Sequence, residues 1–190
     1  MPSSDHGNSW YALRTFHAQE YKVSLHLERH HVDHFIPMVN HSYRKEDGTW
    51  VKAERPAVHN LLFVRKTGTK AELRSILAEC DYPVSVYHHI DDEQQWYEIS
   101  DNELLELRLL CDKAFSPQFI SQEESELKMG TEVCVKHGPF KGITGKLVRK
   151  NKKYYLVKTF VGLGVMVSVS RWCCEAVRRP EQETRTNSET

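Results

Sequence analysis

Eleven histidines and five cysteines are the residues of this chain that could bind a metal or act as nucleophiles. His26, His30 and His34 recur at every fourth residue, a spacing that places side chains on one face of a helix. A zinc site needs three or four ligands that converge on the ion. The helix is expected to end near Val32, which turns His34 away from the other two, and no Cys-x-x-Cys pair occurs. The pattern therefore favours a chain without a bound metal.

The cysteines also lack the neighbours that catalysis requires. No motif places a histidine or a carboxylate beside Cys111, Cys134 or the adjacent Cys173 and Cys174, and no phosphate-binding or dinucleotide-binding glycine pattern occurs. Adjacent cysteines rarely bridge each other and the total is odd, so we expect reduced thiols in a cytoplasmic protein. We expect neither a cofactor nor an enzymatic activity. A metal-dependent enzyme is the alternative, and bound-metal analysis would detect it.

Charge divides the chain into two parts. The 190 residues hold 26 Lys and Arg and 26 Asp and Glu. Residues 1–120 carry 13 basic and 18 acidic side chains, whereas residues 121–190 carry 13 basic and 8 acidic ones, which is typical of two bodies joined by a linker. The best apolar run, residues 161–169, is far shorter than the roughly 18–20 residues of a membrane span, and the start does not resemble a signal peptide. We therefore expect no membrane association.

The apolar pattern of the first part predicts alternating strands and helices. Val23 and Leu27 repeat at helical spacing, and Thr69 and Ser100 are each followed three residues later by a glutamate, the capping-box signature of a helix start. We expect strands at residues 10–15, 32–44, 50–51 with 58–64, and 84–87, and helices at residues 18–31, 69–80 and 101–114. This order predicts an α+β, ferredoxin-like (split βαβ) domain over residues 9–114, with helices on one face of an antiparallel sheet.

The second part of the chain has a different composition and a different apolar pattern. Residues 115–127 are polar and contain a proline and several serines, as is typical of a linker. Residues 128–178 contain five short β segments, at 132–136, 143–149, 154–159, 165–169 and 173–177, which predict a small all-β barrel. Residues 1–8 and 179–190 are expected to be disordered.

A glycine-rich stretch at the start of the barrel carries the first family resemblance. Between residues 133 and 148 a strand runs into a tight loop that presents a phenylalanine and a lysine at its tip, and a glycine then lets the chain reverse. This spacing resembles the KOW motif of NusG-type transcription factors and of several ribosomal proteins, and it implies an SH3-like KOW barrel. The loop residues that we expect to meet a partner are Pro139, Phe140, Lys141 and Gly142.

The first part resembles the N-terminal (NGN) domain of the NusG family. Trp10 and Tyr11 open a strand, a helix follows, and the segments 35–38 and 58–64 match the family in position. The family's Phe-Pro-Gly-Tyr is here Val58, His59, Asn60 and Leu61, and asparagine is the non-glycine residue best suited to a left-handed turn. Asparagine also stands there in the specialised RfaH-type paralogues, so the resemblance, which covers roughly residues 10–177, favours an operon-specific regulator.

What the resemblance implies is a bacterial transcription elongation and antitermination factor. An apolar patch on the first sheet would dock on the clamp helices of the largest subunit of RNA polymerase, while the barrel of a monomeric factor recruits Rho or a small-subunit ribosomal protein. Alternate strand residues share a face, so Leu61 and Phe63 should face the clamp while Leu62 and Val64 face the helices. By position, the polymerase-binding residues are Arg14, Val58, Leu61, Phe63, Arg74 and Ser75, and the residues that would read the non-template DNA strand are His17, Gln19, Lys22 and His26.

Simpler interpretations exist for these residues, namely core packing for the apolar ones and a solvated helix surface for the polar ones. Lys146 to Lys153 adds five basic residues on a hairpin, followed by Tyr154 and Tyr155. Such a cluster could bind RNA by phosphate pairing and stacking, or could be a solvated edge protected against aggregation. A ribosome-associated RNA-binding KOW protein is accordingly the alternative function. Because β-branched and aromatic residues dominate residues 154–169, we expect a stable barrel rather than the helical second domain of RfaH.

Overall fold

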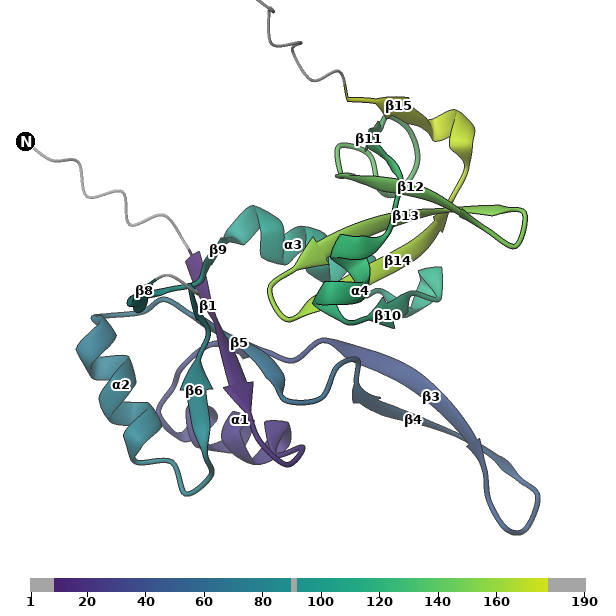
Figure 1. Ribbon diagram of the computed structural model, residues 1–190. Helices are drawn as coiled ribbons and strands as arrows, with labels where there is room; N and C mark the ends of the chain where they lie inside the picture. Colours follow the sequence, from purple (N-terminus) through teal and green to yellow (C-terminus); the bar gives the residue numbers. More distant parts are fainter. Residues whose placement is uncertain (1–8, 90–91, 178–190) are drawn as a thin grey trace, which may run out of the picture.

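Two main antiparallel sheets, one in each half of the chain, position the residues of interest (Figure 1). In this computed structural model, residues 9–89 and 92–177 are described. The expected disorder of residues 1–8 and 179–190 therefore falls outside the described part of the chain.

The first sheet is centred on strand β1 (Ser9–Thr15). Its order is β2 (His34–Phe35), β5 (Leu61–Arg65), β1 and β6 (Val84–Val86), and β9 (Glu98–Ser100) also pairs with β1. All of these pairings are antiparallel, and Ala12 stands opposite Phe63 in the register of β1 and β5. The sheet confirms the α+β prediction for the first domain.

Helices α1 (Glu20–Arg29) and α2 (Lys70–Ala78) cover one face of this sheet. The core on that side combines Tyr11, Leu13, Leu62 and Val64 from the strands with Val23, Leu27, Leu73 and Leu77 from the helices. The predicted capping boxes are present, because Thr69 and Ser100 each accept a hydrogen bond from the backbone N–H of the glutamate three residues on. The carboxylate of each glutamate in turn accepts a hydrogen bond from the backbone N–H of its capping residue.

The third helix, α3 (Asp101–Leu110), does not join α1 and α2. Its buried leucines pack on the opposite face of the sheet, so the expectation that all helices share one face is wrong for α3. The helix is also shorter than predicted, because Asp112 caps a separate 3₁₀ turn, η1 (Lys113–Phe115). Helix α1 starts later than predicted because His17 and Ala18 have φ of 56° and 54°, in the left-handed region.

Strands β3 (Met38–Arg44) and β4 (Trp50–Pro56) form a two-stranded ribbon that projects from the first domain (Figure 1). The turn at residues 45–48 forms as predicted, with Gly48 at φ 87°. Residues 50–51 and 58–64 are not one interrupted strand, since β4 pairs with β3 alone while β5 enters the main sheet. A second small pair, β7 (His88–His89) with β8 (Asp92–Trp96), was not predicted.

The second sheet forms the barrel. Its order is β10 (Gln118–Ile120), β14 (Leu163–Val169), β13 (Lys153–Phe160), β12 (Thr144–Lys150), β11 (Thr131–Val135) and β15 (Cys174–Ala176). A 3₁₀ turn, η2 (Arg171–Cys173), precedes β15. The predicted linker is structured, because β10 pairs with β14 and helix α4 (Gln122–Leu127) packs on β13 and β14.

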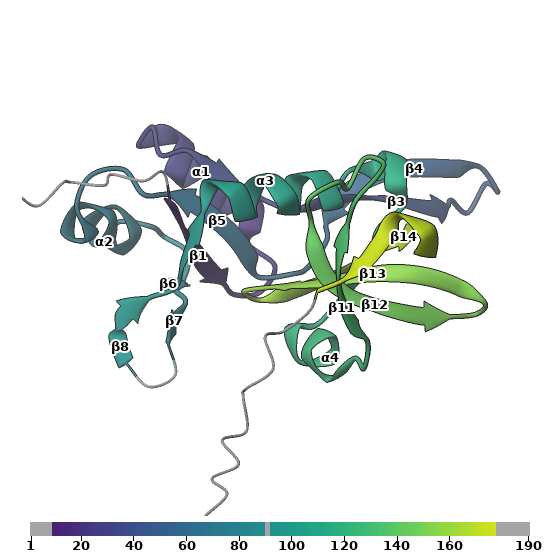
Figure 2. The ribbon, with the colours of Figure 1, turned by 90° about the horizontal axis from the view of Figure 1, so that it is seen from above.

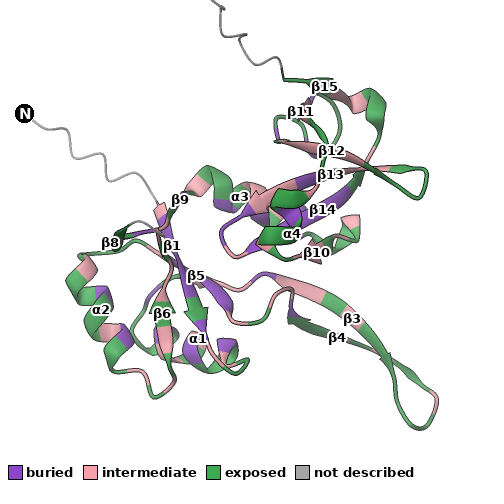
Figure 3. Cartoon of the chain, in the orientation of Figure 1, coloured by how far each residue is buried: buried purple, intermediate pink, exposed green. Residues whose placement is uncertain are grey.

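The two domains share one buried cluster. It joins Trp10, Ala12 and Ile99 of the first sheet, the leucines of α3, and a row of barrel residues that includes Phe160, Val161 and Leu163. Figure 2 shows α3 running from the first domain towards the barrel, and Figure 3 shows buried stretches along β5 and along β14. The first sheet is thus covered on one face by α1 and α2 and on the other by α3 and the barrel.

Candidate functional site

The apolar face of β5 is the centre of the candidate site. Leu62 and Val64 pack with the helices, whereas Leu61 and Phe63 point to the opposite face, so the predicted alternation is confirmed. Leu61 and Phe63 are only 1% and 0% exposed. The sequence prediction of an accessible patch is therefore wrong for this arrangement of the two domains.

The turn between β13 and β14 is what covers Leu61. Gly162, in this turn, has φ of 77°, and a β-carbon built on it would stand 3.0 Å from Leu61 Cδ1 and 3.4 Å from the Tyr87 hydroxyl oxygen. Phe160, Val161 and Leu163 flank the glycine and are buried in the shared cluster. That these residues cover Leu61 was not predicted from the sequence, in which residues 161–169 stood out only as an apolar run.

Polar contacts also surround the junction between the two domains, where the β13–β14 turn covers Leu61. Lys158 of β13 forms an ion pair with Glu106 of α3, and both side chains are mostly shielded from solvent. The backbone N–H of Gly162 donates to Oε1 of Gln122 at 2.8 Å. Burial raises the pKa of the nearby Cys111 thiol to about 12, so this cysteine is protonated at neutral pH. The junction is therefore apolar at its centre and closed by hydrogen bonds at its margin.

The other two members of the predicted patch lie at its border. Val58 is half-buried and packs against the shared cluster, and Arg14 is exposed with its guanidinium 5.5 Å from the centre of the Phe16 ring. Tyr87 of the first domain packs against the shared cluster, and its hydroxyl oxygen lies near Gly162 of the second domain. Its pKa is raised by burial, an effect that the positive charge of Arg14 partly opposes.

A buried carboxylate holds the turn that leads into β5. Asn60 has φ of 64°, as its identity predicted, and its backbone N–H donates to Glu20, which is 1% exposed. The Asn60 side-chain oxygen accepts a hydrogen bond of 3.0 Å from the N–H of Ala18. His59 Nδ1 lies 3.6 Å from the same Glu20 carboxylate. The start of α1 and the start of β5 are thereby tied together.

The predicted DNA-reading residues lie along α1. Lys22 and His26 line one groove together with Arg29 and Tyr82, so the structure brings these two predicted residues together. The Lys22 ammonium lies 4.7 Å from the centre of the Tyr82 ring. The His26 ring already contacts α2, because its Nε2 lies 2.7 Å from the carbonyl oxygen of Ile76.

The remaining members of that group lie at the amino end of α1. His17 is exposed in the left-handed region, and Gln19 is the half-buried residue before the helix. The two further polymerase-binding candidates are on α2. Arg74 is exposed over the Trp96 ring at 5.0 Å, and the Ser75 hydroxyl donates to the carbonyl of Ala71.

The loop of the barrel motif is only partly as predicted. Gly142 has φ of 93°, and its N–H donates to the carbonyl of Val135, which closes the loop. Pro139 and Lys141 are exposed. Phe140 is not presented at the tip, because it is 4% exposed and meets the Phe115 ring edge-on at a centroid distance of 4.6 Å. The prediction that Phe140 meets a partner is wrong for this arrangement.

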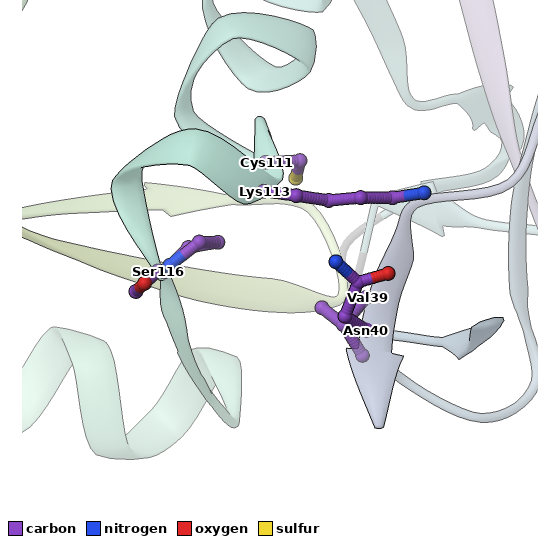
Figure 4. Close-up of a pocket in the computed structure, with 6 residues that line it drawn as sticks. Val39, Asn40, Cys111, Lys113 and Ser116 are labelled. Atoms are coloured by element: carbon purple, nitrogen blue, oxygen red, sulfur yellow. The ribbon is translucent and has the colours of Figure 1, made fainter. Parts of the chain in front are cut away.

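No metal centre emerges from residues 9–89 and 92–177. Groups of three metal-ligating side chains do not occur among them, although the His26 and His30 rings stand 4.6 Å apart. The small pocket of Figure 4 lies between β3 and η1, with Cys111, Lys113 and Ser116 facing Val39 and Asn40. Lys113 of η1 forms an ion pair with Glu54 of β4. This ion pair links the β3–β4 ribbon to the segment that follows α3.

Within the described residues, none of the helices is both long and apolar enough to cross a lipid bilayer. A comparison with curated proteins returned no match. A solved structure described as "Domain interaction in Thermotoga maritima NusG" is 15% identical, covers 90% of this chain and 98% of its own, and superposes with a TM-score of 0.46. The family model described as "Transcription termination factor nusG" matches residues 8–108, which is more than half of the chain. The chain therefore belongs to the NusG family of transcription elongation and antitermination factors, which act on RNA polymerase.

Proposed function

We propose that this protein is a bacterial, operon-specific regulator of transcription elongation that binds the clamp helices of RNA polymerase through Leu61 and Phe63. One observation carries the proposal. These two side chains point away from α1 and α2, which complete the core on the other face of the sheet, and are covered instead by α3 and by the second domain. Separation of the second domain would expose this apolar sheet face, and apolar surface drives most protein association.

The closed arrangement makes polymerase and the barrel competitors for one surface. Leu61 cannot contact another protein while Gly162 and its neighbours lie against it. A ligand shifts an equilibrium only by its difference in affinity for the two states, so polymerase would favour the open one. Binding would then release the barrel to recruit a second partner.

The exposed residues support the remaining roles. Lys22 and His26 lie together in an open groove on α1, which suits contact with the non-template DNA strand. Pro139 and Lys141 are exposed on the barrel loop and are available to Rho or a ribosomal protein in both arrangements. The Asn60 turn, stabilised by Glu20, supports the comparison with RfaH-type regulators.

The test is direct binding of the full-length protein to purified RNA polymerase. Lys158→Glu places a second negative charge beside Glu106 and should open the junction. We expect this variant to bind polymerase about tenfold more tightly than the parent, equivalent to about 1.4 kcal/mol of relieved competition. Adding Leu61→Asp to the opened variant should abolish the binding.

The matched control is Leu105→Asp in the same opened background. Leu105 lies on α3 and is 59% exposed, so this change introduces the same charge without touching the covered face. It should bind polymerase as the opened parent does. If the opened Leu61→Asp variant is folded by circular dichroism and still binds polymerase with undiminished affinity, the proposed surface is wrong.

A further inference from the structure

The hairpin of β12 and β13 carries a concentrated positive charge that the domain junction does not use. Its basic residues are Lys146, Arg149, Lys150, Lys152 and Lys153, and residues 133–174 contain no aspartate or glutamate. Lys146 donates to the backbone carbonyl of Glu126 at 2.8 Å. Within the described ranges, the other four basic side chains form no ion pair. These four like charges repel one another, and a bound anion would relieve that repulsion.

Each face of the hairpin near its turn combines a tyrosine with cations. Arg149 stands opposite Tyr154 in the register, with its guanidinium 5.8 Å from the centre of that ring. On the other face Tyr155 stands opposite Val148, and the next pair on that face is Lys150 with Lys153. Tyr154 and Tyr155 are half-buried, whereas the lysines are exposed. An aromatic surface therefore lies beside positive charge on both sides of one ribbon.

Protection of a sheet edge does not account for this cluster. β12 and β13 are the two central strands of the barrel sheet, and only their turn-proximal ends extend beyond the neighbouring strands. The tip turns tightly through Asn151 and Lys152, with φ of 51° and 63°, and it points away from the first sheet (Figure 1). The ribbon is thus accessible while the domains are closed.

We propose that this hairpin binds single-stranded RNA. Lysines neutralise successive phosphates, and tyrosine rings stack on unpaired bases, which a duplex would not expose. Four of the five cations are lysines, whose ammonium groups bind phosphate as point charges. The tyrosine hydroxyls and the Asn151 amide can bond a 2′-hydroxyl group. The choice of RNA over DNA rests on the proposed function, because a factor held on a transcribing polymerase lies beside the transcript.

The experiment measures fluorescence anisotropy of a labelled 12-nucleotide RNA of mixed sequence with the full-length protein, in the absence of polymerase. The variant Lys150→Glu/Lys153→Glu should lose at least about tenfold in affinity at low salt. It should also reduce the magnitude of the slope of log K against log salt by about 1.4, since each phosphate contact to a single strand contributes about 0.7 to that slope. Tyr155→Leu should weaken binding several-fold and leave the salt slope unchanged, because stacking releases no counterions.

A charge-matched control is the double reversal Lys45→Glu/Lys52→Glu on the β3–β4 ribbon. Both lysines are exposed on a projecting hairpin, so net charge changes equally. This control should bind RNA within twofold of the parent. Equal losses in the two double variants, absence of RNA binding by the parent, or tighter binding to the DNA 12-mer of the same sequence would each overturn the proposal. Polymerase binding by Lys150→Glu/Lys153→Glu should be unchanged, so failure here leaves the proposed polymerase surface untouched.

Discussion

Gly162 of the barrel lies directly against Leu61 of the first sheet, and a β-carbon at this position would crowd the contact. A β-carbon there would stand 3.0 Å from Leu61 Cδ1 and 3.2 Å from Leu61 Cδ2. The glycine also has a φ of 77°, which other residues adopt only with strain. We therefore expect a methyl group at this position to disturb the domain junction.

Gly162→Ala should open the junction and increase binding to RNA polymerase. The added methyl group forces the turn away from Leu61, while the left-handed backbone adds a local strain of about 1–2 kcal/mol. Small-angle scattering should report a larger radius of gyration, and polymerase affinity should rise.

The control for backbone strain is Gly138→Ala. Gly138 has φ of 88°, and nothing lies within 4 Å of a β-carbon built on it. This variant should lose a similar stability in the barrel but keep the closed dimensions of the parent. Equal expansion of the two variants would show that strain in the barrel, rather than the clash with Leu61, separates the domains.

The ion pair of Lys158 with Glu106 should contribute to closure in a way that charge reversal can restore. Each single reversal leaves two like charges in a mostly shielded site. We expect each to shift the closed–open equilibrium by about 1–2 kcal/mol, more than for an exposed pair. The double reversal, Glu106→Lys/Lys158→Glu, should return the radius of gyration and the polymerase affinity toward those of the parent. A double reversal that behaves as the sum of the two single changes would contradict a direct interaction.

Local sequence signals predicted the first domain well. The Thr69 and Ser100 capping boxes formed because each needs only one turn of chain. The alternation along residues 61–64 also followed from strand geometry alone, and Asn60 adopted the expected left-handed turn. These features depend on neighbours in sequence.

The errors concern contacts between distant segments. Phe140 lies in a short loop but is buried, and its ring packs on Phe115, which lies outside the barrel motif. Residues 118–120 form a strand because β14 offers them an edge, although their own composition is that of a linker. The covering of Leu61 by a turn about a hundred residues later has no local signal, so the state of the candidate site required the structure.

The turn before β5 should be sensitive to changes at Asn60. Asn60→Gly keeps the left-handed backbone but removes the side-chain acceptor for the N–H of Ala18, which should reduce the free energy of unfolding by about 1 kcal/mol. Asn60→Ala loses that hydrogen bond and adds backbone strain, so about 2–3 kcal/mol is expected. Urea denaturation followed by tryptophan fluorescence measures both. Equal losses for the two variants would show that the backbone conformation contributes nothing.

Cys111 should be the slowest of the five cysteines to react with an alkylating reagent. Burial raises its pKa to about 12, so at pH 8 only about one molecule in ten thousand carries the reactive thiolate. Its rate should therefore still rise about tenfold per pH unit between pH 8 and pH 9.5, where ionisation remains far from complete. Brief iodoacetamide labelling followed by peptide mass mapping gives the rate at each site, and labelling in urea, where burial is lost, provides the reference. If Cys111 in the folded protein is labelled as fast as the half-buried Cys80, or if its rate has levelled off by pH 9, then the junction beside α3 admits water and is not the closed apolar contact described.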